Sequence, residues 1–148
     1  NGQGILLDQH NMDYFPHLTP SNTGVANPTA ILNAYGWTGE VEVCYVTRTY
    51  MTRHGVGRFD TECPKKDINA NMIDMTNVPN PFQDALRYGR MNWGDFYRNI
   101  TKDCSQAIGR FTVNMTVALT HVNEYAGDVF VKPNYISTGL TRVEVEEV

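Results

Sequence analysis

The stretch VEVCYVTRTYMTR, residues 41–53, decides the fold. It is dense in β-branched and aromatic residues, a composition typical of a β-strand. It is also longer than an ordinary strand, so we expect it to bend or to cross from one sheet to another. The glycine-containing segment HGVGRF, residues 54–59, interrupts the pattern directly afterwards.

Other strands are predicted on both sides of this stretch. The segment GILLD at 4–8 has the form of a short buried strand, and FTVNMTVALTHV at 111–122 that of a longer one. The tail at 141–148, TRVEVEEV, alternates like a half-exposed strand. Residues 9–27 have no hydrophobic period and are predicted as loop, and 60–90 as loop with at most a helical turn near 82–87.

Two helices are predicted between the strands. One covers 28–36, with Asn27 as its N-cap and Gly36 at its end. The other covers 92–108, where apolar residues recur at helical spacing along one face. Strands that alternate with helices predict an α/β layered fold with a mainly parallel sheet.

Composition sets limits on function. The chain has 148 residues, enough for one domain, and its net charge of −4 argues against binding a nucleic-acid backbone. It contains no apolar run of the roughly 18 residues that a membrane helix needs. The three cysteines lack metal-ligand spacing, so we interpret them as reduced thiols of a cytoplasmic protein and expect no metal site in this chain.

Three segments carry candidate chemistry, each with a purely structural alternative. The glycines flanking Gln3 would let a ligand approach the backbone, or form a plain tight turn. The loop HLTPSNTG at 17–24 offers hydroxyls, an amide and free N–H groups for a phosphate, or is a surface loop. MTRHGVGRFDTE at 51–62 places Arg53, His54 and Gly55 after a strand, where α/β proteins bind ligands, or is a glycine-rich bend.

These segments, in this order, resemble the adenylosuccinate synthetase family and its phage-type relatives. The matching text is GQGILLDQHNMDYFPHLTPSN, then TRHGVGRFDTE, then LRYGRMNWGDF and ALTHVN, over roughly residues 2–123. The family condenses aspartate with a 6-oxopurine nucleotide such as IMP: a nucleoside triphosphate phosphorylates the 6-oxygen, and aspartate displaces the phosphate. The resemblance implies a fold of the P-loop NTPase type and, in the full-length enzyme, Mg²⁺ with GTP or ATP.

The resemblance also implies roles for single residues. Gln3 would be the catalytic residue, hydrogen-bonded at the 6-oxygen side of the purine, where charge develops. Thr19, with Asn22 in the same loop, would contact the monophosphate. His54 and Gly55 occupy the positions that approach the ribose, after Arg53. Arg87 falls near the arginines that bind aspartate and nucleotide.

One departure concerns the base of the triphosphate. Where the family has Thr-Lys-x-Asp, which reads guanine, this chain has His121 and Asn123 at the base-binding positions. An amide cannot accept two hydrogen bonds from the base as a carboxylate does. ATP therefore becomes a plausible donor, as in the phage-type enzymes that join aspartate to (d)GMP.

The family's phosphate loop, catalytic Asp and catalytic His precede the matched text, and the tail after 123 is unmatched. We therefore expect residues 1–148 to be one domain from the centre of such an enzyme, inactive alone, with no tightly bound cofactor. A homodimer is expected, with no nucleic-acid or membrane partner. The alternative from another class is a non-catalytic nucleotide-binding or scaffold module.

Overall fold

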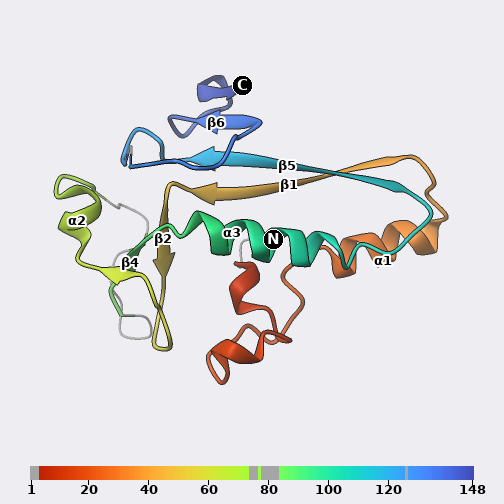
Figure 1. The fold of residues 1–148 in the computed structure, drawn as a ribbon, viewed down its shortest axis with the longest axis horizontal. Helices are drawn as coiled ribbons and strands as arrows, with labels where there is room; N and C mark the ends of the chain where they lie inside the picture. The colour runs from red at the N-terminus through yellow and green to blue at the C-terminus, as the bar shows by residue number, and fades with distance from the viewer. Residues whose placement is uncertain (1–3, 74–76, 78–83, 126) are drawn as a thin grey trace. The chain divides into compact units, whose positions relative to one another are not determined.

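The computed structural model describes residues 4–73, 77, 84–125 and 127–148 (Figure 1). The chain divides into two compact units. The first comprises the described residues up to Tyr45 with Gly94–Thr116, and the second comprises Val46–Trp93 with Val117–Val148. Within the described ranges, no helix combines the length and apolar character needed to cross a bilayer.

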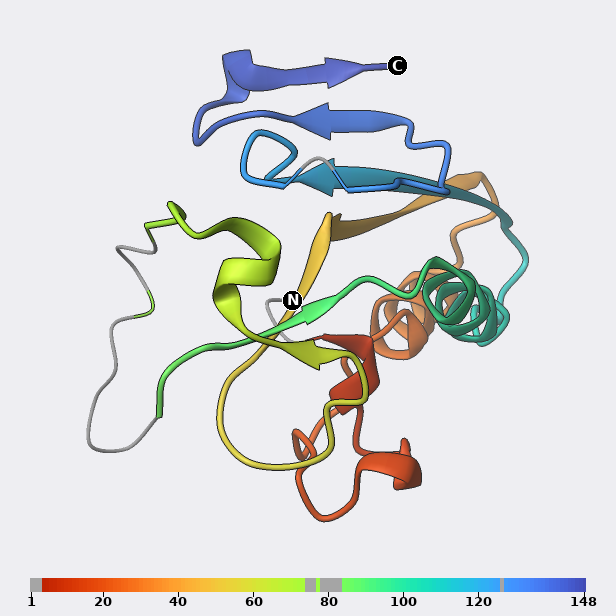
Figure 2. The same cartoon turned by 60° about the vertical axis from the view of Figure 1, so that its left-hand side comes forward.

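The larger sheet is mixed and mainly parallel. Its strand order is β1-β5-β6-β7, with bounds Glu40–Arg48, Thr112–Thr120, Tyr135–Ser137 and Val145–Glu147. β5 pairs with β6 in parallel and β6 with β7 antiparallel, and β1 runs in the same direction as β5 (Figures 1 and 2). Together with the helices, this sheet confirms the predicted α/β class.

The smaller sheet is antiparallel and was not predicted. Its order is β2-β4-β3, with bounds Tyr50–Arg53, Arg87–Arg90 and Glu62–Cys63. β3 and β4 lie in the segment 60–90 that the sequence predicts as loop, and the short helix α2, Lys65–Asn69, lies there too. Near 82–87, where at most a helical turn is predicted, residues 84–86 are irregular and 87 begins β4; residues 82 and 83 lie outside the described residues.

The long stretch 41–53 does cross between the two sheets. β1 ends at Arg48 and β2 begins at Tyr50, so the chain turns at Thr49. Thr49 is buried, and its hydroxyl donates to the carbonyl oxygen of His121 at 3.4 Å. A single run of strand-forming residues thus supplies one strand to each sheet, as its length predicted.

The helices differ from the predictions mainly at their ends. α1 covers Ala26–Tyr35, so Val25 and not Asn27 is the N-cap residue. Its end is as predicted: Gly36 has φ +81° and donates its N–H to the carbonyl of Asn33, a conformation that favours glycine. α3 covers Trp93–Cys104 and is shorter than the predicted 92–108.

The segment GILLD is not a strand. Residues Ile5–Leu7 form the 3₁₀ helix η1, in which the N–H of Leu7 donates to the carbonyl of Gly4. The carbonyl of Leu7 in turn accepts the N–H of Thr19 at 2.8 Å. Three apolar residues in a row are compatible with either a strand or a helical turn, and the contacts of the neighbouring loop decide between them.

The remaining short elements lie in the predicted loop at 9–27 and in the tail. The loop contains one further 3₁₀ turn, η2 (Met12–Tyr14). In the tail, the predicted strand at 141–148 is reduced to β7, because Arg142–Glu144 form the 3₁₀ helix η3. β7 is exposed along its whole length rather than half-exposed.

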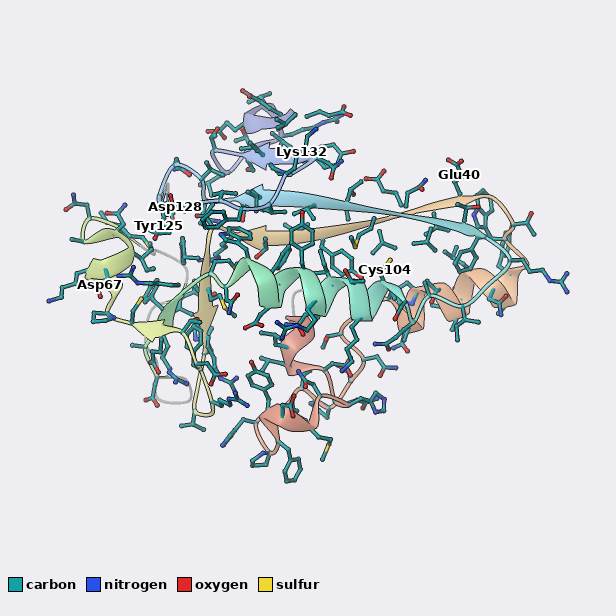
Figure 3. All side chains as sticks on the ribbon, in the orientation of Figure 1. Glu40, Asp67, Cys104, Tyr125, Asp128 and Lys132 are labelled. Atoms are coloured by element: carbon teal, nitrogen blue, oxygen red, sulfur yellow. The ribbon has the colours of Figure 1, made fainter. Side chains whose placement is uncertain are left out.

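The second unit has a small core of its own. Tyr50, Ile68, Met72 and Tyr88 are buried together. Cys63, Leu86 and Tyr125, the last of which is labelled in Figure 3, pack against them as partly buried side chains. The cluster joins β2, β4 and α2. Packing of this kind stabilises strands too short to be recognised by their own sequence.

In the first unit, the buried carboxylate of Asp103 on α3 joins the two helices. The N–H of Val25, at the start of α1, points at both carboxylate oxygens at 3.3 Å, and the hydroxyl of Tyr45 donates to Oδ2 at 2.7 Å. A negative charge at a helix N-terminus is favourable. Burial, together with the hydrogen bond to Asp103, raises the pKa of Tyr45, so the hydroxyl stays protonated and donates.

Gly24 is required for this contact, because a Cβ at this position would lie 1.7 Å from Oδ1 of Asp103. We expect Gly24→Ala to lower the free energy of unfolding by about 1–3 kcal/mol, measured by urea denaturation. Gly4→Ala is the matched control, since a Cβ there meets nothing within 4 Å, and its effect should stay within about 0.5 kcal/mol. Equal effects of the two substitutions would contradict the role of Gly24.

Candidate functional site

The predicted site residues are distributed over both units. Thr19 and Asn22 belong to the first unit. The second unit holds all the others that are described, namely Arg53, His54, Gly55, Arg87, His121 and Asn123. Gln3 lies outside the described residues, so its role stays a prediction.

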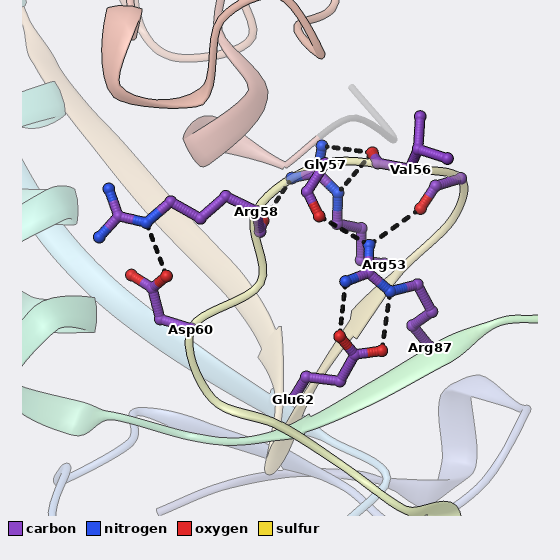
Figure 4. A network of polar contacts seen from close by, with 8 residues as sticks. Arg53, Val56, Gly57, Arg58, Asp60, Glu62 and Arg87 are labelled. Atoms are coloured by element: carbon purple, nitrogen blue, oxygen red, sulfur yellow. Dashed lines mark hydrogen bonds and ion pairs between the residues drawn. The ribbon is translucent and has the colours of Figure 1, made fainter.

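Residues 54–61 follow β2 and form a loop that is here named the glycine loop. Arg53, the last residue of β2, is buried beneath it. Its guanidinium donates to the carbonyl of Val56 from Nε and Nη2, at 3.3 and 3.0 Å, and to the carbonyl of Arg58 from Nη1 at 3.1 Å (Figure 4). Arg53 therefore folds the backbone of the loop around its own side chain.

The two glycines of the loop let its carbonyl groups turn inward. Gly55 has φ +70° and Gly57 has φ +111°, values that side chains with a Cβ adopt only under strain. The carbonyl oxygens of both glycines accept hydrogen bonds from Nη1 of Arg87, at 3.0 and 2.9 Å. The glycines therefore permit the backbone conformation in which the loop carbonyls reach Arg87.

The other side of the Arg87 guanidinium faces Glu62. Nε and Nη2 donate to the two carboxylate oxygens at 2.8 and 2.6 Å, a bidentate pair (Figure 4). The hydrogen bond to Arg87 holds the pKa of Glu62 below its usual value, and the same bond raises the pKa of Arg87. The guanidinium carbon also lies 5.4 Å from the centre of the Phe59 ring. Arg87 therefore connects β3, β4 and the glycine loop.

An open hollow of about 350 Å³ lies beside this loop. Its lining combines an apolar side with charged groups, and consists of Gly55, Val56, Gly57, Asp84, Ala85 and Arg87. Asp84 is exposed and offers acceptor oxygens, while Val56 and Ala85 offer apolar surface. Acceptor oxygens beside apolar groups can contact a small ligand that has both hydroxyl groups and C–H surface, as a sugar has.

His54 is exposed at the start of the glycine loop. Its Nε2 lies 2.9 Å from Oδ1 of Asn77, which gives the imidazole a partner outside the loop. This contact restricts the direction of the side chain at the position that the resemblance places near a ribose.

In the first unit, the loop 17–24 is held by Asp8. The carboxylate of Asp8 accepts the N–H of His10 at 2.9 Å and that of Thr23 at 2.7 Å. Burial alone would raise the pKa of Asp8, but these backbone N–H groups hold it below its ordinary value. Asp8 therefore remains ionised and ties this loop to the end of η1.

The prediction of free N–H groups in the loop 17–24 is wrong for four residues. The N–H groups of His17, Thr19, Ser21 and Thr23 donate to Tyr14, Leu7, Thr19 and Asp8. The Asn22 side chain also has partners, since Oδ1 accepts from Gln9 at 2.9 Å and Nδ2 donates to Asn27 at 2.8 Å. The hydroxyl of Thr23 also has a partner, since it donates to the carbonyl of Gly4 at 3.3 Å.

His121 and Asn123 lie in the turn that follows β5. His121 has φ +60°, and its carbonyl oxygen accepts the N–H of Glu124 at 3.0 Å. The Asn123 side chain is exposed.

The sequence analysis did not identify Glu62 as a site residue, although Glu62 ends the motif TRHGVGRFDTE. An acidic residue in a predicted loop has no periodic pattern that indicates which residue it pairs with.

Mg²⁺ is expected only for the full-length enzyme. In the part of the chain that is described, no three His, Cys, Asp or Glu side chains group as a metal site.

Compared with known proteins, the chain matches no family model, no curated protein and no solved structure.

We expect Arg87→Lys to loosen the glycine loop, because an ammonium group cannot bridge Glu62 and two carbonyls as a guanidinium does. Cleavage by trypsin after Arg58, whose side chain is 58% exposed, should accelerate about tenfold. Arg90→Lys is the matched control on the same strand, since Arg90 lies 4.0 Å from its partner Asp67. Cleavage at equal rates in both variants would contradict the role of Arg87.

Proposed function

We propose that this chain binds a purine nucleoside monophosphate, as the nucleotide-binding portion of a ligase resembling adenylosuccinate synthetase. The supporting observation is that TRHGVGRFDTE, one of the two specific parts of the resemblance, forms a loop whose own side chains hold its backbone. Arg53, Gly55, Gly57 and Glu62, all residues of this motif, each make or permit a contact that shapes it. The motif therefore has a physical basis in this chain.

The hollow beside the glycine loop is proposed to receive the ribose. Asp84 supplies acceptors for hydroxyl groups, and Val56 supplies apolar contact. His54 and Gly55 approach the sugar from the loop. Arg53 and Arg87 act mainly as positioning residues, because their guanidinium groups are directed at loop carbonyls and at Glu62.

The other ends of the nucleotide are assigned by the resemblance. The Thr19 hydroxyl, with the neighbouring Asn22, contacts the monophosphate, and Gln3 contacts the purine at its 6-oxygen side. Aspartate and a nucleoside triphosphate are the remaining substrates, and the fold is proposed to be part of the adenylosuccinate synthetase fold. The chain has no Walker A motif, so we expect binding of nucleotides without turnover.

The test is a thermal-shift titration of the 148-residue chain with IMP, GMP and dGMP. We expect one of them to raise the Tm by about 5 °C at saturation. Thr19→Ala and Gln3→Ala should each remove most of this shift, whereas Thr38→Ala, an exposed threonine of the first unit, should retain it. No shift with any of the three nucleotides would refute the proposal.

Asn123 favours ATP over GTP as the triphosphate. Its exposed amide donates one hydrogen bond and accepts another, which matches the amino group and ring nitrogen of adenine. Guanine instead presents two N–H donors, and a carboxylate at this position would accept both. The observation supports the phage-type reaction with (d)GMP and ATP.

We expect Asn123→Asp to shift the ratio of GTP to ATP affinity by about tenfold towards GTP, measured by calorimetry. Asn114→Asp adds the same charge at an exposed position on β5 and should leave the ratio unchanged. An unchanged ratio in Asn123→Asp would show that this residue does not read the base.

A further inference from the structure

The turn after β5 contains a backbone conformation that its residue does not favour. His121 has φ +60°, in the left-handed region, where a Cβ costs roughly 1–2 kcal/mol. It lies at the carboxyl end of β5, which is paired in parallel with β6. Ligands of open α/β sheets gather at this end of the strands, so strain here points to a functional conformation.

Several donors close the turn around the carbonyl oxygen of His121. This oxygen accepts the N–H of Glu124 at 3.0 Å and that of Tyr125 at 3.4 Å, and the hydroxyl of Thr49 lies at 3.4 Å. Asn123 lies between His121 and Glu124 in the sequence. The backbone on both sides of Asn123 is therefore fixed.

Glu124 is held by a buried hydroxyl. Tyr50, which is 1% exposed, donates from its hydroxyl to Oε2 of Glu124 at 2.5 Å and accepts a hydrogen bond from Nη1 of Arg48 at 3.1 Å. Asn69 donates to the backbone carbonyl of Glu124 at 2.7 Å. Burial, with the hydrogen bond to Glu124, raises the pKa of Tyr50, so the phenol remains a donor.

The Tyr50 ring also meets His121 directly. The two ring centres are 6.1 Å apart at an interplanar angle of 83°, an edge-to-face contact. One side chain thus contacts both ends of the turn, the imidazole through its ring and Glu124 through its hydroxyl. Phenylalanine would fill the same apolar space without these hydrogen bonds. The hydroxyl of Tyr50 therefore contributes to the conformation of the turn through its polar partners.

We propose that Tyr50 is a positioning residue for the nucleobase of the triphosphate, which holds His121 and Asn123 in the conformation that meets the base. The inference rests on the proposed function and adds to it a determinant of triphosphate affinity that lies in the core. The contacts proposed for the monophosphate do not include the turn after β5, so Tyr50 should affect binding of the triphosphate and not binding of the monophosphate.

The experiment measures binding of ATP and of the best monophosphate to the 148-residue chain by calorimetry. Tyr50→Phe should weaken ATP about tenfold, the effect of losing a hydrogen bond to a charged group, and leave the monophosphate within about twofold. Tyr45→Phe is the matched control: it removes a buried hydroxyl that also donates to a carboxylate, but in the first unit. It should leave ATP binding unchanged.

A double-mutant cycle separates positioning from general loss of stability. Glycine adopts φ +60° without cost, so in a His121→Gly background the turn no longer needs the hydroxyl to hold it. We expect the penalty of Tyr50→Phe on ATP binding to fall from about tenfold to about twofold in that background. Glu124→Gln, which keeps a neutral acceptor for Tyr50, should give an intermediate loss and serves if Tyr50→Phe does not fold.

The possible failures are distinguishable. If the unsubstituted chain binds the monophosphate, the inference alone is overturned by any of three results: no binding of ATP, equal losses of both nucleotides in Tyr50→Phe, or the same penalty in the His121→Gly background. If the unsubstituted chain binds no nucleotide at all, the proposed function fails and the inference with it.

Discussion

The guanidinium of Arg87 is the group on which the smaller sheet and its loop depend. It satisfies inward-facing carbonyls of the glycine loop and pairs with Glu62 through two parallel hydrogen bonds. An isolated ion pair at a surface contributes little to stability, but a bidentate pair that also binds backbone carbonyls has a fixed geometry. Since β3 is short, this connection adds to its pairing with β4.

Strand β2 also fixes loops of this unit through its buried side chains. Its two ends are both buried: Tyr50 at the start contacts the turn after β5, and Arg53 at the end organises the glycine loop. A strand of this kind positions two separate loops from within the core. Substitutions in β2 can therefore change the conformation of two loops at once.

In the first unit, two carboxylates hold a loop and the start of a helix. Asp8 ties the loop 17–24 to the end of η1, and Asp103 fixes the start of α1. Both accept backbone N–H groups that would otherwise be available to an anion. The backbone N–H groups of this loop are therefore less available to a ligand than its sequence suggests.

Local sequence determined those elements whose residues have one strongly preferred conformation. The β-branched run at 41–53 specified strands and, by its length, the turn at Thr49; Gly36 specified the end of α1, and Gly55 and Gly57 an interruption after β2. Only tertiary structure decided the strands β3 and β4, the helical turn at Ile5–Leu7, and the partners of Arg87, Tyr50 and Asp103. The reason is that a short strand, a buried charge and a strained residue such as His121 are stable only through groups distant in the sequence, and no local pattern records which groups those are.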